Sequence, residues 1–329
     1  PFIQKLDANG DLVWAVSFLP SATGQAQAIA VDDSGSVYTA GTFFGTADFD
    51  PGPGTTNLTS AGGRDVFVQK LDSNGLFVWA RSFGGPNDDD PFSIHVDAAG
   101  NVYTVGSFFT TCDFDPGPGT FERTSAGGRD VFVQKMDENG DFQWAGTFGN
   151  TGFDEARSVA VDASGNVYTV GHFTGTVDFD PDTAVTANES AVGNLDGFVH
   201  KLDASGDFVW VRVFGGGANE RPYSVALDDD GNIYTAGSFN GLATDFDPGP
   251  GTLSFNTSGA LDAFVQKLDA SGDLVWARAF GGNGNEEAYA IALDDASNIY
   301  TTGFFDGTSD FDPDTTASDD RTAVGSGDG

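Results

Sequence analysis

The chain has 329 residues, of which 49 are Asp or Glu and 14 are Lys or Arg, so its formal net charge is −35. Such a charge repels nucleic acid and anionic membrane surfaces, and cations are its natural partners. Because no apolar run approaches the roughly 20 residues that cross a bilayer, we also expect no membrane insertion. The acidity indicates either metal binding or a solvated surface that keeps the protein in solution.

A sequence unit of about 65 residues repeats five times along this chain. The tryptophans stand 65, 65, 66 and 66 residues apart, and the lysines and the Asp-Pro steps follow nearly the same spacing. No Pro/Ser-rich linker separates the copies, so we expect one all-β domain over residues 1–329. The tryptophans are Trp14, Trp79, Trp144, Trp210 and Trp276.

Each copy predicts four short strands and almost no helix, because apolar and polar residues alternate within short runs. Gly10 ends the turn between the first and second strands, and Gly35 ends the turn between the third and fourth, as tight hairpins require. A long connection, residues 44–65, leads to the next copy. The strands expected in the first copy are residues 2–6, 12–18, 27–31 and 36–43.

The fourth strand carries a glycine at its middle in every copy. A glycine there costs stability unless something bulky packs against the bare backbone. We therefore expect the repeat tryptophan, or an aromatic side chain of the neighbouring sheet, to cover it. These residues are Gly41, Gly106, Gly171, Gly237 and Gly303.

The strands are expected to form an antiparallel meander in the order third, fourth, first, second. In that order the two tight turns share one face of the domain, and the long acidic connections share the opposite face. Five such sheets stacked radially make a five-bladed β-propeller of four-stranded blades. The chain begins at a first strand and stops just before one, so residues 2–18 and 288–305 are expected to share one blade and close the ring.

Two phrases of the sequence, FVQKLDSNGLFVWARSFGG at 67–85 and SVAVDASGNVYTVGHF at 158–173, resemble the bacterial β-propeller repeats called SBBP repeats. The resemblance covers all five copies, although the Asp-Phe-Asp-Pro-Gly loop lengthens the unit. It implies a propeller on an exported or cell-surface bacterial protein that acts as a binding or scaffold module. Because the sequence begins at Pro1 without a signal-like segment, we expect a mature product or a piece of a longer chain.

The Asp-x-Asp-Pro loop is the strongest candidate for a site. Two carboxylates at i and i+2 offer the hard oxygen ligands that Ca²⁺ prefers. Alternatively, the second Asp forms an Asx turn over Pro-Gly while the first binds a backbone amide or a nearby cation. The ten residues are Asp48, Asp50, Asp113, Asp115, Asp178, Asp180, Asp245, Asp247, Asp310 and Asp312. A third metal ligand is expected from the Asp before each first strand, namely Asp65, Asp130, Asp196, Asp262 and Asp328.

Two further sets of residues lie on or beside the third strand. The acids of the connection before it form either a mouth for a cation or basic ligand, or a solvated rim. One position within the strand varies among the copies, and we interpret it as a contact with a small-molecule ligand, with variable core filling as the alternative. The acids are Asp88 to Asp90, Asp154, Glu155, Glu220, Glu286 and Glu287. The variable column is Gln27, Phe92, Arg157, Tyr223 and Tyr289.

No nucleophile motif, metal-His cluster or phosphate loop occurs in the sequence. His95, His172 and His200 are scattered over different strands, so each is interpreted as a tolerated substitution. We expect a non-enzymatic extracellular module that contacts a carbohydrate or protein ligand through the long-loop face and is stabilised by Ca²⁺ if the aspartate loops bind it. The alternatives are a glycan-processing enzyme with channel carboxylates, which equivalent acids in equivalent places disfavour, and a structural subunit of a surface fibre or layer.

Overall fold

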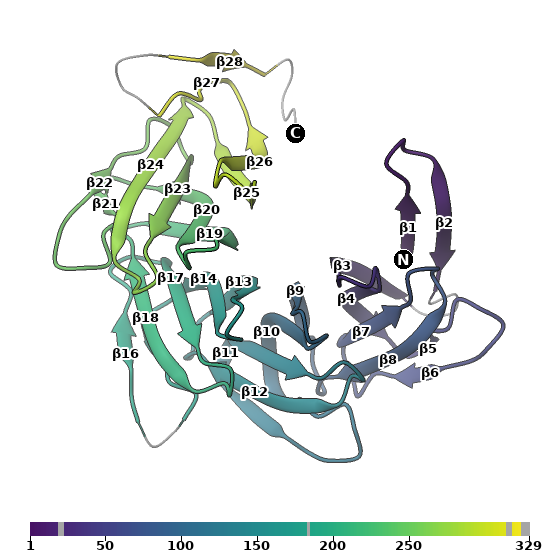
Figure 1. Ribbon diagram of the computed structural model, residues 1–329. Coiled ribbons are helices and arrows are strands. Elements are labelled where there is room, and N and C mark those ends of the chain that lie inside the picture. The colour runs from purple at the N-terminus through teal and green to yellow at the C-terminus, as the bar shows by residue number, and fades with distance from the viewer. Residues whose placement is uncertain (19–22, 183–184, 314–317, 324–329) are drawn as a thin grey trace. The chain divides into compact units, whose positions relative to one another are not determined.

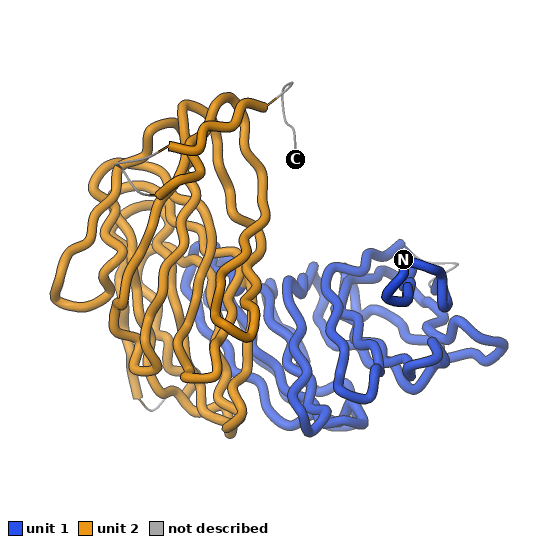
Figure 2. Tube along the Cα trace, turned by 45° about the horizontal axis from the view of Figure 1, so that its top comes forward, with its two compact units in different colours: residues 1–156 blue, residues 157–329 orange. Residues whose placement is uncertain are grey.

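The computed structural model describes residues 1–18, 23–182, 185–313 and 318–323, and within them it contains strands, turns and loops but no helix. The all-β prediction is therefore confirmed. No helix able to cross a membrane exists in this part of the chain. The chain divides into two compact units, residues 1–156 and residues 157–329, which are coloured blue and orange in Figure 2.

Unit 1 contains a two-stranded sheet and two four-stranded antiparallel sheets (Figure 1). The two-stranded sheet is β1 (Phe2–Leu6) and β2 (Leu12–Ser17). The first four-stranded sheet is β3 (Thr23–Val31), β4 (Val37–Phe44), β7 (Asp65–Leu71) and β8 (Phe77–Phe83). The second is β9 (Asp90–Val96), β10 (Val102–Asp113), β11 (Glu122–Met136) and β12 (Phe142–Phe148). In the long connection β5 (Thr46–Asp48) pairs with β6 (Asn57–Thr59).

Unit 2 repeats this plan, and its first sheet begins with β13 (Glu155–Val161), which starts at the unit boundary. That sheet continues with β14 (Val167–Phe173), β17 (Asp196–Leu202) and β18 (Phe208–Phe214). The next sheet is β19 (Asn219–Leu227), β20 (Ile233–Asn240), β23 (Asp262–Leu268) and β24 (Leu274–Gly282), extended by β27 (Thr308–Asp310) and β28 (Asp320–Thr322). The last main sheet is β25 (Glu286–Leu293) with β26 (Ile299–Phe305). Two short pairs, β15 (Thr176–Asp178) with β16 (Asn188–Ser190) and β21 (Thr244–Asp245) with β22 (Ser254–Phe255), lie in the connections.

The strand order is the one that the sequence predicts. Each four-stranded sheet joins the third and fourth strands of one repeat to the first and second strands of the next, as in β3-β4-β7-β8. The two halves of the expected closing blade, β1-β2 and β25-β26, are each a two-stranded sheet. The five-bladed ring, its closure and the single-domain boundaries stay predictions.

The mid-strand glycine is covered by a phenylalanine of the same sheet. Gly41 pairs with Phe67 of β7, and a Cβ at Gly41 would lie 2.8 Å from the Phe67 ring and would overlap the backbone oxygen of Gln25. The expectation of a tryptophan or of an aromatic from the neighbouring sheet was wrong, because the strand register brings the cross-strand phenylalanine over the glycine. The tryptophan packs elsewhere: the Trp79 ring lies 6.2 Å from the Tyr38 ring.

The core of each full sheet includes a cluster of four phenylalanines. In unit 1, Phe49 of the Asp-Phe-Asp-Pro loop lies 5.1 Å from Phe43 and 5.1 Å from Phe67, and Phe18 lies 5.7 Å from Phe67. Three of these four rings are fully buried. The loop is therefore anchored to the core by its central residue, while its two aspartates flank that anchor.

Candidate functional site

The aspartates of the Asp-Phe-Asp-Pro loop accept hydrogen bonds from the backbone of their own loop. Asp48 Oδ1 accepts from the amides of Asp50 at 3.1 Å and Thr56 at 2.8 Å. Asp50 Oδ1 accepts from the amide of Gly52 at 2.7 Å, which is the Asx turn. Every other copy makes the equivalent bonds to the first Asp, and three of them make the Asx turn as well. These bonds hold the loop without requiring any further ligand.

The expected third metal ligand does not complete a metal site within the described residues. Asp262 lines a cavity of ≈ 260 Å³ together with Asp310 and Asp312 of the following repeat. Nevertheless, no group of three or more His, Cys, Asp or Glu side chains in the described residues is placed so that it could hold a metal ion. Asp328 lies outside the described residues. Ca²⁺ binding at the ten loop aspartates stays a prediction.

The Asp before each first strand instead approaches an acid of the connection before the third strand. Asp65 and Asp89 are both buried, and burial raises the pKa of each carboxyl to about 7. Asp65 Oδ2 accepts the Ala61 amide and Asp89 Oδ2 accepts the Gly85 amide, each at 2.8 Å. The equivalent pairs are Asp130 with Asp154, Asp196 with Glu220, and Asp262 with Glu286, all buried.

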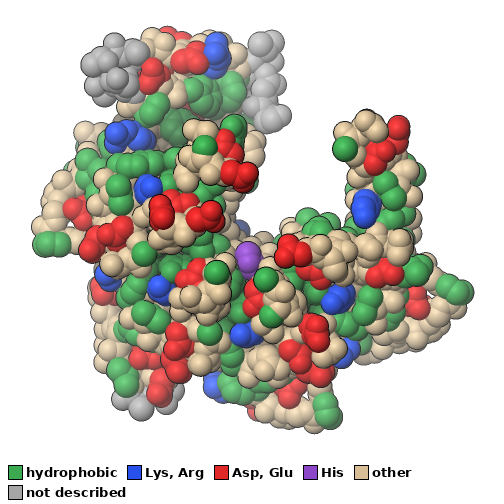
Figure 3. All heavy atoms as spheres, viewed as in Figure 1, with side chains coloured by type: hydrophobic (Ala, Val, Ile, Leu, Met, Phe, Trp, Pro, Cys, Tyr) green, Lys and Arg blue, Asp and Glu red, His purple; other side chains and the backbone are tan. Residues whose placement is uncertain are grey.

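The acids of the connection before the third strand were expected to form a cation mouth or a solvated rim. The member of each pair that comes from this connection is buried instead. A Cβ at Gly281 would lie 2.8 Å from Asp262 Oδ1 and 2.9 Å from Glu286 Oε2, so the two carboxylates converge above a bare glycine. Glu286 is further held by the Ser309 hydroxyl, which donates to it. Each acid therefore holds the backbone of its own connection inside the protein. The acids at the surface are spread over the face shown in Figure 3 without gathering into one patch.

The variable column of the third strand coincides with a β-bulge in four strands. Ala26 pairs with Gly41 and Ala28 pairs with Ala40, so the strand register skips Gln27 between them. Phe92, Tyr223 and Tyr289 are skipped in the same way, and Arg157 occupies the same position of β13. A bulge turns one side chain out of the regular pairing, and bulges are frequent beside binding and active sites. The variation among copies marks this column in the sequence, whereas the bulge depends on the strand register.

In unit 2 the column takes part in a cluster that we call the tyrosine cluster, made of Tyr223, Ser238, Glu287 and Tyr289. The Tyr223 hydroxyl donates to Glu287 Oε2 at 2.8 Å, and the Ser238 hydroxyl lies 3.4 Å from that of Tyr223. The rings of Tyr223 and Tyr289 are 5.5 Å apart with an interplanar angle of 62°. Tyr289 is 49% exposed, so the cluster reaches solvent. Burial, followed by the hydrogen bond to Glu287, raises the pKa of Tyr223 to about 12, which keeps its hydroxyl a donor.

His172 lies within electrostatic range of two arginines, Arg157 of the variable column and Arg221. Burial, together with the positive charges of Arg157 and Arg221, lowers the pKa of His172 to about 3. The imidazole is therefore neutral at physiological pH. Arg221 pairs with Ser238 across β19 and β20, two residues before the bulge at Tyr223.

The interpretation of His172 as a tolerated substitution missed this arrangement, and no sequence motif pointed to Arg221. A signal was present, since the position two residues before the bulge also varies among copies: Gln25, Asp90, Glu155, Arg221 and Glu287. His200, in contrast, is a buried substitute for a glutamine. Its Nε2 lies 3.0 Å from the Phe179 carbonyl, where Gln266 donates to the Phe246 carbonyl at 2.7 Å.

Comparison with known proteins identifies the repeat. Residues 209–247, from β18 to the Asp-Phe-Asp-Pro loop, match the family model described as a beta-propeller repeat, SBBP. This segment is similar to an SBBP-type propeller repeat. The SBBP match therefore includes one bulge and one of the arginines beside the tyrosine cluster.

Two curated relatives match part of this chain. An uncharacterized WD repeat-containing protein of Acanthamoeba polyphaga mimivirus is 24% identical over 92% of this chain and 26% of its own length. The regulatory protein FlaEY of Caulobacter vibrioides is 28% identical over 45% of this chain and 15% of its own. The chain thus spans about a quarter of the first relative.

Among solved structures, a protein of unknown function from Bacteroides caccae is 10% identical and aligns over 82% of this chain and 86% of its own, with a TM-score of 0.29. At that score the similarity carries no argument about fold or function.

Proposed function

We propose that this chain forms a closed five-bladed propeller on an exported or cell-surface bacterial protein, where it serves as a non-enzymatic binding or scaffold module. The SBBP repeat and the WD repeat-containing relative support a propeller module. The observation that carries the binding role is the bulge at one position of the third strand. The scaffold around this position repeats, whereas the side chain that it displays varies, with four residue types among the five copies, as expected for a recognition position on a fixed frame.

The ligand contact is assigned to the tyrosine cluster and the arginines beside it. Tyr289 offers an exposed aromatic face, and Arg157 and Arg221 carry positive charge in a chain whose net charge is −35. An aromatic face packs against the C–H face of a sugar ring, and a guanidinium binds a carboxylate through paired hydrogen bonds. The ligand class that fits both is an acidic carbohydrate.

The carboxylates give no support to a glycan-processing enzyme. A glycosidase needs two acids with different roles on either side of the scissile bond. The acid pairs of this chain are equivalent from copy to copy, buried, and occupied by hydrogen bonds to backbone amides. We therefore assign them to loop structure.

Screening the full chain on a glycan array, with Ca²⁺ and with chelator, tests the binding role. We expect selective binding of carboxylate-bearing glycans and at least about tenfold weaker binding after Tyr289→Ala or Arg221→Ala, since each removes a desolvated contact of about 1.4 kcal/mol or more. Gln27→Ala, the exposed member of the same column in unit 1, is the matched control and should bind as the parent does. No binding to any glycan, or equal losses in all three variants, would refute the assignment.

A further inference from the structure

In three sheets a buried threonine of the fourth strand lies opposite a glutamine of the next first strand. Thr104 of β10 pairs with Gln134 of β11, for example, and both side chains are fully buried. Directly opposite residues of an antiparallel pair project from the same face of the sheet, with Cβ atoms about 4.5–5.5 Å apart. The two side chains of each pair are therefore neighbours in the core. The pairs are Thr39 with Gln69, Thr104 with Gln134, and Thr235 with Gln266.

The glutamine amide has a fixed orientation, because its nitrogen holds the Asp-Phe-Asp-Pro loop. Gln134 Nε2 donates to the carbonyl of Phe114 at 2.6 Å. Gln266 Nε2 donates to the carbonyl of Phe246 at 2.7 Å. Only the NH₂ group of an amide donates, so the reverse orientation would place two acceptors against each other. The amide oxygen Oε1 is therefore fixed as an acceptor that needs a donor from elsewhere.

Two buried oxygens of each pair, the threonine Oγ1 and the glutamine Oε1, have no hydrogen-bond partner among the described residues. Thr104 and Gln134 are both 0% exposed, so bulk solvent does not reach them. A buried donor or acceptor without a partner is destabilising, and native proteins satisfy nearly all such groups with protein atoms or ordered water. Because the same two atoms recur in three sheets, the feature belongs to the repeat.

The neighbouring residues in the same row of the sheet are apolar and supply no donor. Ile94 of β9 pairs with Thr104 on one side. Ala145 of β12 pairs with Gln134 on the other side, and both neighbours are buried. Backbone amides within strands are taken up by the pairing between the strands. In unit 2 the corresponding neighbours are Val225 and Ala277.

One sheet has a histidine in place of the glutamine and keeps the same distribution of donor and acceptor. His200 pairs with Thr169, and its Nε2 lies 3.0 Å from the Phe179 carbonyl. Burial lowers the pKa of His200 to about 3, so the imidazole is neutral. The nitrogen beside a carbonyl oxygen must carry the proton, which makes Nδ1 an acceptor, as Oε1 is in glutamine. The acceptor is thus retained when the residue type changes.

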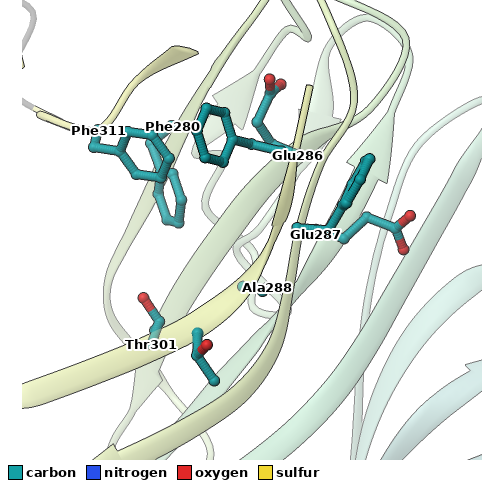
Figure 4. Close-up of a pocket in the computed structure, with 10 residues that line it drawn as sticks. Phe280, Glu286, Glu287, Ala288, Thr301 and Phe311 are labelled. Carbon is teal, nitrogen blue, oxygen red and sulfur yellow. The ribbon is translucent and has the colours of Figure 1, made fainter. Parts of the chain in front are cut away.

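The equivalent threonine of β26 places the same hydroxyl in solvent. Thr301 is exposed and lines a cavity of ≈ 110 Å³ together with Phe280 and Phe311 (Figure 4). Water therefore reaches this hydroxyl directly. The buried threonines of the other sheets require the same hydrogen-bond partner inside the core.

We infer that each buried threonine–glutamine pair binds one water molecule, which bridges the threonine Oγ1 and the glutamine Oε1. The water donates one hydrogen to Oε1, and its second contact is the hydroxyl, which is able to donate or to accept. Buried waters make two to four hydrogen bonds and occur about once per 27 residues, so one water per sheet is an ordinary frequency. The water completes a chain of contacts from the fourth strand, through the glutamine, to the phenylalanine carbonyl of the loop. This inference depends neither on ring closure nor on glycan binding.

A high-resolution crystal structure of the full chain tests the inference. We expect electron density for a water at about 2.5–3.0 Å from both Thr104 Oγ1 and Gln134 Oε1. The same density is expected between Thr235 and Gln266 in unit 2. A dry contact in both pairs, or a direct hydrogen bond between the two side chains, overturns the inference.

The sign of a stability change gives a second test. Thr104→Val keeps the shape of the side chain and removes one contact of the water, so the Tm should fall by about 2–4 °C. Thr235→Val repeats the test in unit 2, and Thr120→Val, at an exposed loop position, is the matched control and should leave the Tm unchanged. If the hydroxyls were unsatisfied, their removal would relieve a cost. A Tm that stays constant or rises in Thr104→Val and Thr235→Val would therefore overturn the inference, and the crystal structure distinguishes a water from a direct bond.

Discussion

Two strands of unit 2 have nearly the same sequence but different surroundings. β20 reads IYTAGSFN and β26 reads IYTTGFF. Thr235 and Gly237 of β20 are buried between β19 and β23, whereas Thr301 and Gly303 of β26, with a neighbour on one side only, are exposed. The burial of a repeat strand is therefore decided by the strand beside it, because the residues themselves are almost unchanged.

The largest expected effect comes from removing the buried Phe264 side chain, which packs beside β20. Phe264→Ala removes the ring that covers Gly237 and completes the four-phenylalanine cluster, so we expect a loss of about 3–5 kcal/mol in the free energy of unfolding. Urea unfolding followed by tryptophan fluorescence measures it, with Phe153→Ala as the exposed control at less than about 0.5 kcal/mol. A loss under about 1 kcal/mol would show that the strand beside β20 does not explain the difference in burial between β20 and β26.

Buried acid pairs occur in both units of the chain. They predict that the stability of the protein depends on pH, with an effect of intermediate size. Burial raises the pKa of Asp65, Asp89 and Glu220 to about 7. Unfolded carboxyls ionise near pH 4, so between about pH 4 and 7 the folded state binds more protons and its stability falls as the pH rises. We expect a Tm several degrees higher at pH 5 than at pH 8.

A matched pair of variants separates this effect from the overall charge. Asp89→Asn should flatten the pH dependence, because it removes a group with a raised pKa. Asp72→Asn removes the same charge from an exposed turn, where backbone hydrogen bonds hold the pKa low, and should leave the slope between pH 5 and 8 intact. A Tm that rises between pH 5 and 8 in the parent chain would contradict the assignment.

The prediction of strands and turns succeeded where the controlling interactions are local. Asp72 accepts hydrogen bonds from the amides of Asn74 and Leu76, and Gly75 has φ +79°. The residues that form this turn are therefore all within the Asp-x-x-Gly motif or next to it. The bulge at Tyr223 and the partner of Gly41 depend on the register between strands, which the spacing within one strand does not specify. The pairing of Asp65 with Asp89 depends on two loops that lie 24 residues apart in the chain. The electrostatic effect of Arg157 and Arg221 on His172 likewise depends on residues that are distant in the sequence.

Calcium is expected to have the smallest effect. Each loop aspartate already accepts backbone amides, so we expect affinities no tighter than about 1 mM, and 1 mM Ca²⁺ then contributes about 0.4 kcal/mol or less per site. Thermal unfolding with Ca²⁺ and with chelator measures this contribution, with Asp50→Asn as the variant. A rise of several degrees that chelator and the variant both abolish would instead establish the loops as calcium sites.

Amide hydrogen exchange along β26 tests the account most directly. If the hairpin of residues 2–18 occupies this edge, the amides of residues 299–305 exchange as slowly as those of residues 233–239 in β20. Rapid exchange along β26 together with slow exchange along β20, in the full chain at neutral pH, would show that the edge of β26 is unpaired. That result would contradict the closed ring of the proposed function.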